Sequence, residues 1–167
     1  MGMSVTISAA TEKDAEQIFR LQYLCFQREA EIYGNYRIGP LVQTLDELRT
    51  EMATDRVLVA RLGDEVVGAV RGNLDADGTG HIGKLCVHPR IQGHGLGARL
   101  LSAVERELAG SLGARRFQLN TGHRSESNLR LYSKAGYERV GGTTGSDGIR
   151  MITLEKEALA DAYVTSA

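Results

Sequence analysis

The chain has 167 residues and a formal net charge of −1, with 42% hydrophobic and 25% charged residues. These are ordinary values for one globular domain with a sizeable core. A protein that grips the phosphate backbone of a nucleic acid usually carries a basic excess, so the charge argues against that partner.

No apolar run approaches the roughly 20 residues that cross a bilayer, and the first residues lack the pattern of a signal peptide. The two cysteines, Cys25 and Cys86, show neither metal-ligand nor redox-motif spacing, and the histidines show no metal-ligand spacing either. Reduced thiols are usual in the cytosol. We therefore expect a cytoplasmic protein with no metal, no membrane partner and no nucleic-acid partner.

The first half of the chain predicts a strand, two helices and a strand hairpin. Thr11 with Asp14, and Thr44 with Glu47, have the spacing of helix-capping residues, which predicts a helix start at each pair. Between the two helices, residues 31–43 contain glycine and proline without a clear period, which indicates a loop. The expected strands are 4–9, 57–62 and 65–73, the last two joined by a Gly63-Asp64 turn, and the second helix is 44–53.

The second half alternates strands with helices, which predicts an α/β fold with helices packed on one mixed sheet. We expect a single domain over residues 1–167, with a core of about 4–155 and a tail at 156–167 for which a frayed helix is the expectation. The expected strands are 80–88, 116–120, 137–142 and 149–154, and the expected helices are 96–110 and 125–135.

The stretch Leu85–Leu101 (LCVHPRIQGHGLGARLL) joins a strand to a helix through a glycine-rich turn. Such a turn presents several backbone N–H groups to one point, where the helix N-terminus adds about half a positive charge. The stretch therefore predicts an anion site, for a phosphate or a pyrophosphate.

Three phosphate motifs compete for this turn. A nucleoside-triphosphate loop needs Gly-Lys-Ser/Thr, which is absent, and Gly93, Gly95 and Gly97 do not have the Gly-x-Gly-x-x-Gly spacing of a dinucleotide site. The third pattern, Gln/Arg-x-x-Gly-x-Gly/Ala, is met by residues 92–97. After a strand and Pro89, this stretch resembles the pyrophosphate signature of the GNAT superfamily, the acyl-CoA-dependent N-acetyltransferases.

The resemblance extends over the element order from about residue 4 to residue 155, and to the segment Asn128–Tyr137 (NLRLYSKAGY). It implies a mostly antiparallel central sheet, splayed between the fourth and fifth strands and flanked by helices on both faces. It also implies that Asn128 contacts the cofactor and that Tyr132, four residues on and therefore on the same helical face, lies near the thioester sulfur.

By this resemblance the co-substrate is acetyl-CoA, and the amine attacks the thioester directly in a ternary complex. The end of the fourth strand pairs with the pantetheine arm, and Val87 N–H polarises the acyl carbonyl as in an oxyanion hole. The implied CoA contacts are Leu85, Cys86, Val87, Gln92, Gly93, His94, Gly95, Leu96, Gly97, Ala98, Asn128 and Tyr132.

Acid–base groups are the next requirement, because at pH 7 only about one alkylamine in a few thousand is neutral. The family often has a glutamate early on the fourth strand; the matching residue here is His81, whose ordinary pKa near 6.5 suits a general base. Proton loss through water, or in bulk before binding, is the alternative. Tyr132 is expected to protonate the departing thiolate, and a packed tyrosine that only hydrogen-bonds the sulfur is the alternative.

The acceptor is expected between the first two helices and the last hairpin, at a rim that carries tyrosines and carboxylates. Such a rim suits a small cationic molecule with a primary amine, although an ordinary polar rim is equally consistent. A protein N-terminus or lysine is the nearer alternative acceptor, a non-catalytic acyl-CoA sensor the more distant function, and a homodimer is possible. The rim residues are Tyr23, Tyr33, Tyr36, Glu29, Glu31 and Asp46, with Thr143–Arg150 opposite.

Overall fold

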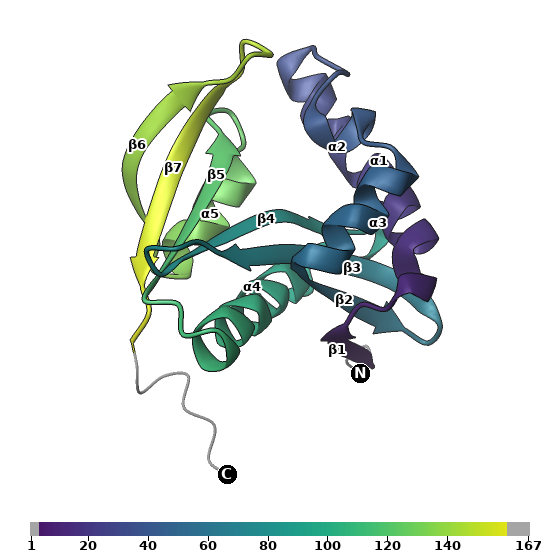
Figure 1. Cartoon of the computed structure of the whole chain (residues 1–167). Coiled ribbons are helices and arrows are strands. Elements are labelled where there is room, and N and C mark those ends of the chain that lie inside the picture. The colour runs from purple at the N-terminus through teal and green to yellow at the C-terminus, as the bar shows by residue number, and fades with distance from the viewer. Residues whose placement is uncertain (1–3, 160–167) are drawn as a thin grey trace.

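The computed structural model describes residues 4–159, which form one mixed sheet with helices on both faces (Figure 1). The seven strands lie in the order β1-β2-β3-β4-β5-β7-β6. Every neighbouring pair is antiparallel except β4 and β5, which run parallel. The expected fold class is therefore confirmed. The strands are β1 (Val5–Ala9), β2 (Arg56–Leu62), β3 (Glu65–Leu74), β4 (Thr79–Val87), β5 (Arg116–Gly122), β6 (Glu138–Thr144) and β7 (Arg150–Glu157).

Within residues 4–159 there are five α-helices; Thr44 caps α3, and Thr11 caps a 3-10 turn (Glu12–Asp14) that leads directly into α1. The Asp14 carboxylate accepts from Thr11 N at 2.8 Å, while Thr44 and Glu47 form the reciprocal capping box. The helices are α1 (Ala15–Tyr33), α2 (Gly39–Val42), α3 (Leu45–Thr54), α4 (Leu96–Arg106, continued by a π-helical turn at Glu107–Ser111) and α5 (Glu126–Lys134).

Two expectations about the ends of elements are wrong. The expected loop at 31–43 contains the last turn of α1, which ends at the left-handed Gly34, and the short helix α2. Residues 156 and 157 belong to β7 rather than to a helical tail, because they pair with β5. Residues 160–167, the rest of the expected tail, lie outside the described part of the chain.

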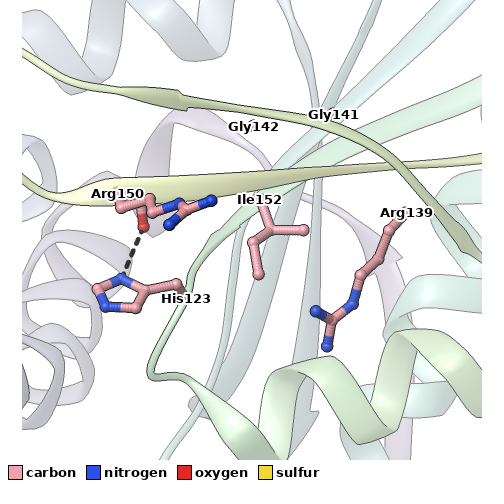
Figure 2. Close-up of a pocket in the computed structure, with 6 residues that line it drawn as sticks. All are labelled: His123, Arg139, Gly141, Gly142, Arg150 and Ile152. Carbon is pink, nitrogen blue, oxygen red and sulfur yellow. Dashed lines mark hydrogen bonds between the residues drawn. The ribbon is translucent and has the colours of Figure 1, made fainter.

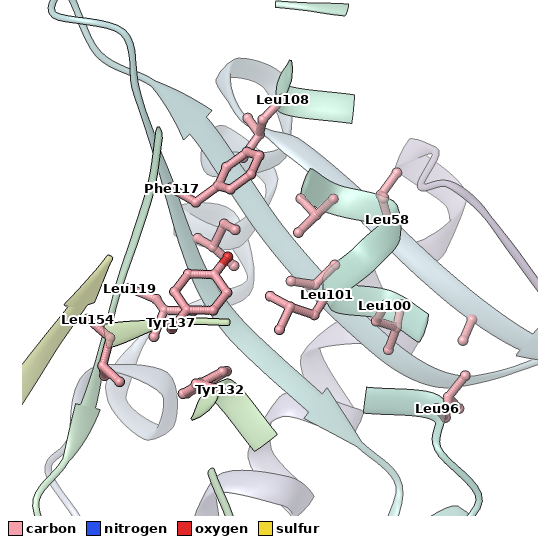
Figure 3. Packing of buried hydrophobic residues seen from close by; sticks show 14 of the residues in the cluster. Leu58, Leu96, Leu100, Leu101, Leu108, Phe117, Leu119, Tyr132, Tyr137 and Leu154 are labelled. Carbon is pink, nitrogen blue, oxygen red and sulfur yellow. The ribbon is translucent and has the colours of Figure 1, made fainter. Parts of the chain in front are cut away.

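Two apolar layers hold the helices to the sheet. On one face, α4 and α5 pack Leu100, Leu101 and Tyr132 against Phe117 and Leu154 (Figure 3). On the other face, α1 and α3 cover a smaller cluster that includes Ile18, Leu48 and Val59. An ion pair also ties the start of α1 to β2, since the Arg61 guanidinium donates to both Asp14 oxygens at 2.8 and 2.6 Å. None of the described helices is long and apolar enough to cross a membrane.

The sheet opens between β4 and β5. These parallel strands pair only from Thr79↔Arg116 to Ile82↔Leu119, so the second half of β4 has no neighbour on that side. This opening is called the slot below, and it confirms the expected splay.

A β-bulge in β4 marks the start of its unpaired half. Between the pairs Ala69↔Cys86 and Arg71↔Gly83, β4 carries one residue more than β3. Lys84 lies in this bulge with φ of 52°, which is unusual for a residue other than glycine. No feature of the sequence predicts it.

Candidate functional site

The edge of the slot on β4 carries a free hydrogen-bond donor. His88 N donates to Val67 O, and because antiparallel backbone groups alternate in direction, Val87 N–H points away from β3 and toward the slot. No described residue accepts from this N–H. A carbonyl oxygen placed in the slot could therefore accept it, as expected for Val87.

The glycine-rich turn lies directly after β4. Gly93 and Gly95 have φ of 88° and 76°, values that favour glycine, and Gly95 is the N-cap of α4. The N–H groups of residues 92–98 donate to no described backbone or side-chain acceptor. Since they converge at a helix N-terminus, they can bind an anion such as a pyrophosphate. The Gln92 side chain instead donates to Val87 O at 3.1 Å, so it supports the strand end.

Helix α5 forms the β5 side of the slot. Asn128 and Tyr132 share a face, and Asn128 Nδ2 lies 3.4 Å from Thr121 Oγ1. Tyr132 is buried, its ring packs edge-on against Tyr137, and its hydroxyl bonds to no described residue. Burial, and then the charge of Glu29, raises the pKa of Tyr132 well above its ordinary value. The phenol therefore stays protonated and is a hydrogen-bond donor.

The structure places His81 before the slot rather than in it. His81 pairs with Gln118 of β5 where the two strands are still joined, four residues before Leu85, which is roughly 13 Å along an extended strand. Its Nε2 lies 2.6 Å from Asp75 Oδ2. The interaction with the Asp77 side chain, and then the hydrogen bond with His81, hold the pKa of Asp75 well below its ordinary value. The role of His81 as a base stays a prediction.

Helix α1 crosses from one side of the slot to the other, which the sequence does not reveal. The Cys25 thiol donates to Val87 O at 3.3 Å on the β4 side. Two turns later the Tyr33 hydroxyl accepts from Arg124 N at 2.9 Å, just beyond β5. Of the expected rim residues, Glu29 and Tyr33 lie on this crossing face, whereas Tyr23 and Tyr36 are exposed.

The two cysteines are also brought together. Cys86 is buried on the α1 face of β4, and its thiol interacts with that of Cys25. The interaction lowers the pKa of Cys25, whereas the same interaction, and then burial, raise the pKa of Cys86. The pair is 61 positions apart in the sequence, so no spacing rule indicates it.

A charged cluster supports the bulge from the α3 side. Lys84 Nζ donates to Gln43 at 2.6 Å and to both Glu51 oxygens at 2.9 Å, and Arg71 Nη1 lies 3.0 Å from Glu51. These contacts hold Lys84 in its left-handed conformation and thereby fix where the unpaired half of β4 begins. Within residues 4–159, no group of three or more histidine, cysteine or acidic side chains could hold a metal ion.

A pocket of about 430 Å³ lies on the side of β6 and β7 that faces α5. Figure 2 shows His123, Ile152 and Arg139 on the same side of β7, with the His123 ring joined to the Arg150 carbonyl at 3.1 Å. Its lining is His123, Arg139, Gly141, Gly142, Arg150 and Ile152.

Comparison with a family model identifies the kind of fold. The model described as the acetyltransferase (GNAT) family matches residues 15–137, well over half of the chain. No curated protein sequence matches the chain significantly.

Solved structures of similar fold cover almost the whole chain. The PaiA N-acetyltransferase of Thermoplasma acidophilum in complex with coenzyme A has a TM-score of 0.76 at 15% identity, over 93% of this chain and 100% of its own. Ard1 of Thermoplasma volcanium has a TM-score of 0.75 at 19% identity, and the match covers 94% of this chain and 99% of the Ard1 chain. The ribosomal-protein-S18-alanine N-acetyltransferase of Escherichia coli has a TM-score of 0.73 at 15% identity, over 92% and 93%. At these identities the likeness establishes the fold and leaves the substrate open.

Proposed function

Because the chain belongs to the acetyltransferase (GNAT) family, we propose that it is an enzyme that transfers the acetyl group of acetyl-CoA to a primary amine of a small molecule. The amine attacks the thioester directly while both substrates are bound. The observation that carries this proposal is the slot between β4 and β5, because free N–H groups lie on its β4 edge, at Val87, and in the turn directly after β4, at residues 92–98.

These donors suit the two parts of CoA that need them. The N–H groups of residues 92–98 bind the pyrophosphate at the start of α4. The pantetheine arm then lies in the slot along Leu85–Val87, whose outer backbone groups have no partner strand. Val87 N–H donates to the acyl oxygen, on which negative charge develops as the amine attacks.

Tyr132 is the proposed donor to the departing sulfur. A proton transfer from a phenol with a pKa near 10 to a thiolate with a pKa near 8.5 costs about 2 kcal/mol, and burial of Tyr132 adds to that cost. Tyr132 therefore acts first as a hydrogen-bond donor that stabilises the thiolate, and the proton moves as C–S cleavage completes.

A small acceptor is favoured by how the far side of the slot is enclosed. The turn between β6 and β7 meets the loop after α1, where Asn35 Nδ2 donates to Asp147 O at 3.2 Å and Ile38 packs with Ile149 (Figure 1). This contact joins the β6–β7 turn to the loop after α1 at one end of the expected acceptor site, and it narrows the path by which an acceptor reaches the slot. The main rival is an N-acetyltransferase for protein or peptide amines, the activity named for the Escherichia coli structure above.

The test is a panel of small amines and N-terminal peptides, with release of the CoA thiol as the signal and titration of CoA as a separate binding assay. Turnover on small amines supports the proposal, and turnover on peptides alone overturns the choice of acceptor. CoA binding without turnover on any amine would identify a sensor instead. In Tyr132→Phe we expect intact CoA affinity with kcat lowered about 10²-fold or more, the usual size of a general-acid contribution.

A further inference from the structure

One face of α1 spans the slot. Cys25, Glu29 and Tyr33 are spaced by four residues, so their side chains lie on the same face at intervals of about 6 Å along the helix axis. The first of them contacts Val87 on β4, and the last contacts Arg124 just beyond β5. Glu29 lies between these two anchors, so its carboxylate faces the slot from α1 and also reaches Ser125 at the start of α5.

The contacts of Glu29 hold its carboxylate there. It accepts a short hydrogen bond from Ser125 Oγ. The Ser125 Oγ in turn lies 3.0 Å from the Tyr33 hydroxyl. Ser125 is 3% exposed, so the link is shielded from water. The negative charge of Glu29 also raises the pKa of Tyr132, after the larger effect of burial, which shows that the carboxylate and the phenol lie within electrostatic reach.

No cation neutralises Glu29 within the described chain. By contrast, Glu51, the carboxylate beside the bulge in β4, is paired with both Lys84 and Arg71. Glu29 bonds only to hydroxyl Ser125. Its second oxygen, Oε2, therefore has no described partner and is available to an incoming ligand.

From this geometry we propose that Glu29 is the general base of the acyl transfer, and that Ser125 and Tyr33 are positioning residues that aim it. The inference rests on the proposed function. The amine nitrogen forms the C–N bond with the acyl carbon, its proton passes to the Glu29 carboxylate, and the C–S bond breaks. The thiolate takes a proton from Tyr132, and the Tyr132 phenolate then takes up the proton held by Glu29, directly or through water. The base lies on α1 and the acid on α5.

His81 is less well placed for this task. It lies where β4 and β5 are still paired, and its Nε2 is already bound to Asp75. To reach the slot its ring would have to leave that partner.

The experiment compares Glu29→Gln with Glu12→Gln in amine transfer. The amide still accepts a hydrogen bond from Ser125, so the contact with α5 survives while the base is removed. Glu12 is the control, because it is exposed in the turn that precedes α1, lies outside the expected acceptor rim, and its side chain bonds to no described residue. For Glu29→Gln we expect kcat to fall about 10²-fold or more, the usual size of a general-base effect, with CoA affinity and Tm near those of the wild type. Glu12→Gln should match the wild type.

Two further readouts separate a base from a structural contact. Glu29→Asp keeps a carboxylate and should fall between the wild type and Glu29→Gln, whereas an equal loss in both variants contradicts the proposal. With an alkoxyamine, which is neutral at the assay pH and whose adduct loses its proton readily to water, the loss in Glu29→Gln should shrink.

Other outcomes overturn the inference. A change in KM alone would make Glu29 a counter-ion for the acceptor, and a loss of CoA affinity would make it a support for α5. A kcat loss in His81→Asn without one in Glu29→Gln would assign the base to His81. These results differ from a failure of the proposed function, in which the wild type itself turns over no amine.

Discussion

The contact between Gly122 and Tyr33 makes a sharp prediction about stability. A Cβ on Gly122 would overlap the Tyr33 hydroxyl and lie 2.9 Å from its Cε2, so Gly122→Ala must displace the tyrosine. The backbone of Gly122 is outside the left-handed region, and alanine is therefore otherwise compatible with this strand position. The cost should come entirely from the loss of Tyr33.

The magnitude follows from the contacts that break. Tyr33 gives up its hydrogen bonds with Ser125 Oγ at 3.0 Å and with Arg124 N at 2.9 Å, each worth about 0.5–1.5 kcal/mol. Replacing glycine by alanine stabilises the folded state by about 0.4–1 kcal/mol, because it restricts the unfolded chain. The net expectation for Gly122→Ala is a destabilisation of about 1–2 kcal/mol.

A double-mutant cycle measured by urea denaturation tests this cause. In a Tyr33→Ala background nothing remains for the new methyl group to displace, so Gly122→Ala should there be neutral or stabilising by up to about 1 kcal/mol. The sign of the substitution thus reverses between the two backgrounds. If Gly122→Ala lowers the free energy of unfolding equally in both backgrounds, the coupling energy is below about 0.5 kcal/mol. That result would refute the assignment of the cost to Tyr33.

Three further predictions concern other parts of the chain. Gly95 has φ of 76°, and a left-handed alanine costs about 1–2 kcal/mol, so Gly95→Ala should lower Tm and also weaken CoA binding about tenfold or more in a calorimetric titration. The control is Gly63→Ala, at φ of 63° in a distant turn, which should lower Tm and leave CoA binding unchanged. The ion pair with Arg61 lowers the pKa of Asp14, so Asp14→Asn should lower the free energy of unfolding by about 2–3 kcal/mol above pH 4, measured by urea titration. The difference between the two proteins should vanish as the pH falls through that lowered pKa, and a difference that does not depend on pH would contradict this assignment. Iodoacetamide should add one group to the folded chain at Cys25 and reach Cys86 only after unfolding; two groups on the folded chain, seen by mass spectrometry, would be inconsistent with the burial of Cys86.

Local patterns predicted the elements that depend on local physics. The capping pairs at Thr11 and Thr44 mark real helix starts, and Gly63 marks a real hairpin. The loop expected from residue 31 is wrong because α1 continues through Glu31, Ile32 and Tyr33, where tertiary contacts such as that of Tyr33 with Arg124 stabilise the helix rather than a clear apolar period. The bulge at Lys84 could not be predicted either, because its left-handed backbone depends on contacts with Glu51 and Gln43 from distant segments.

By itself the sequence indicated the anion site that we propose for the acyl donor. The glycines at 93 and 95, followed by the start of α4, create free N–H groups within seven consecutive residues, so a local motif was sufficient to indicate an anion site. Only the tertiary structure decided the acceptor side. The contact between Glu29 and Ser125 joins positions 96 residues apart, and it exists because α1 packs across the slot where β4 and β5 separate. Side chains that meet through helix packing leave no spacing pattern in the chain, and this is why the base proposed here could be found only in the folded protein.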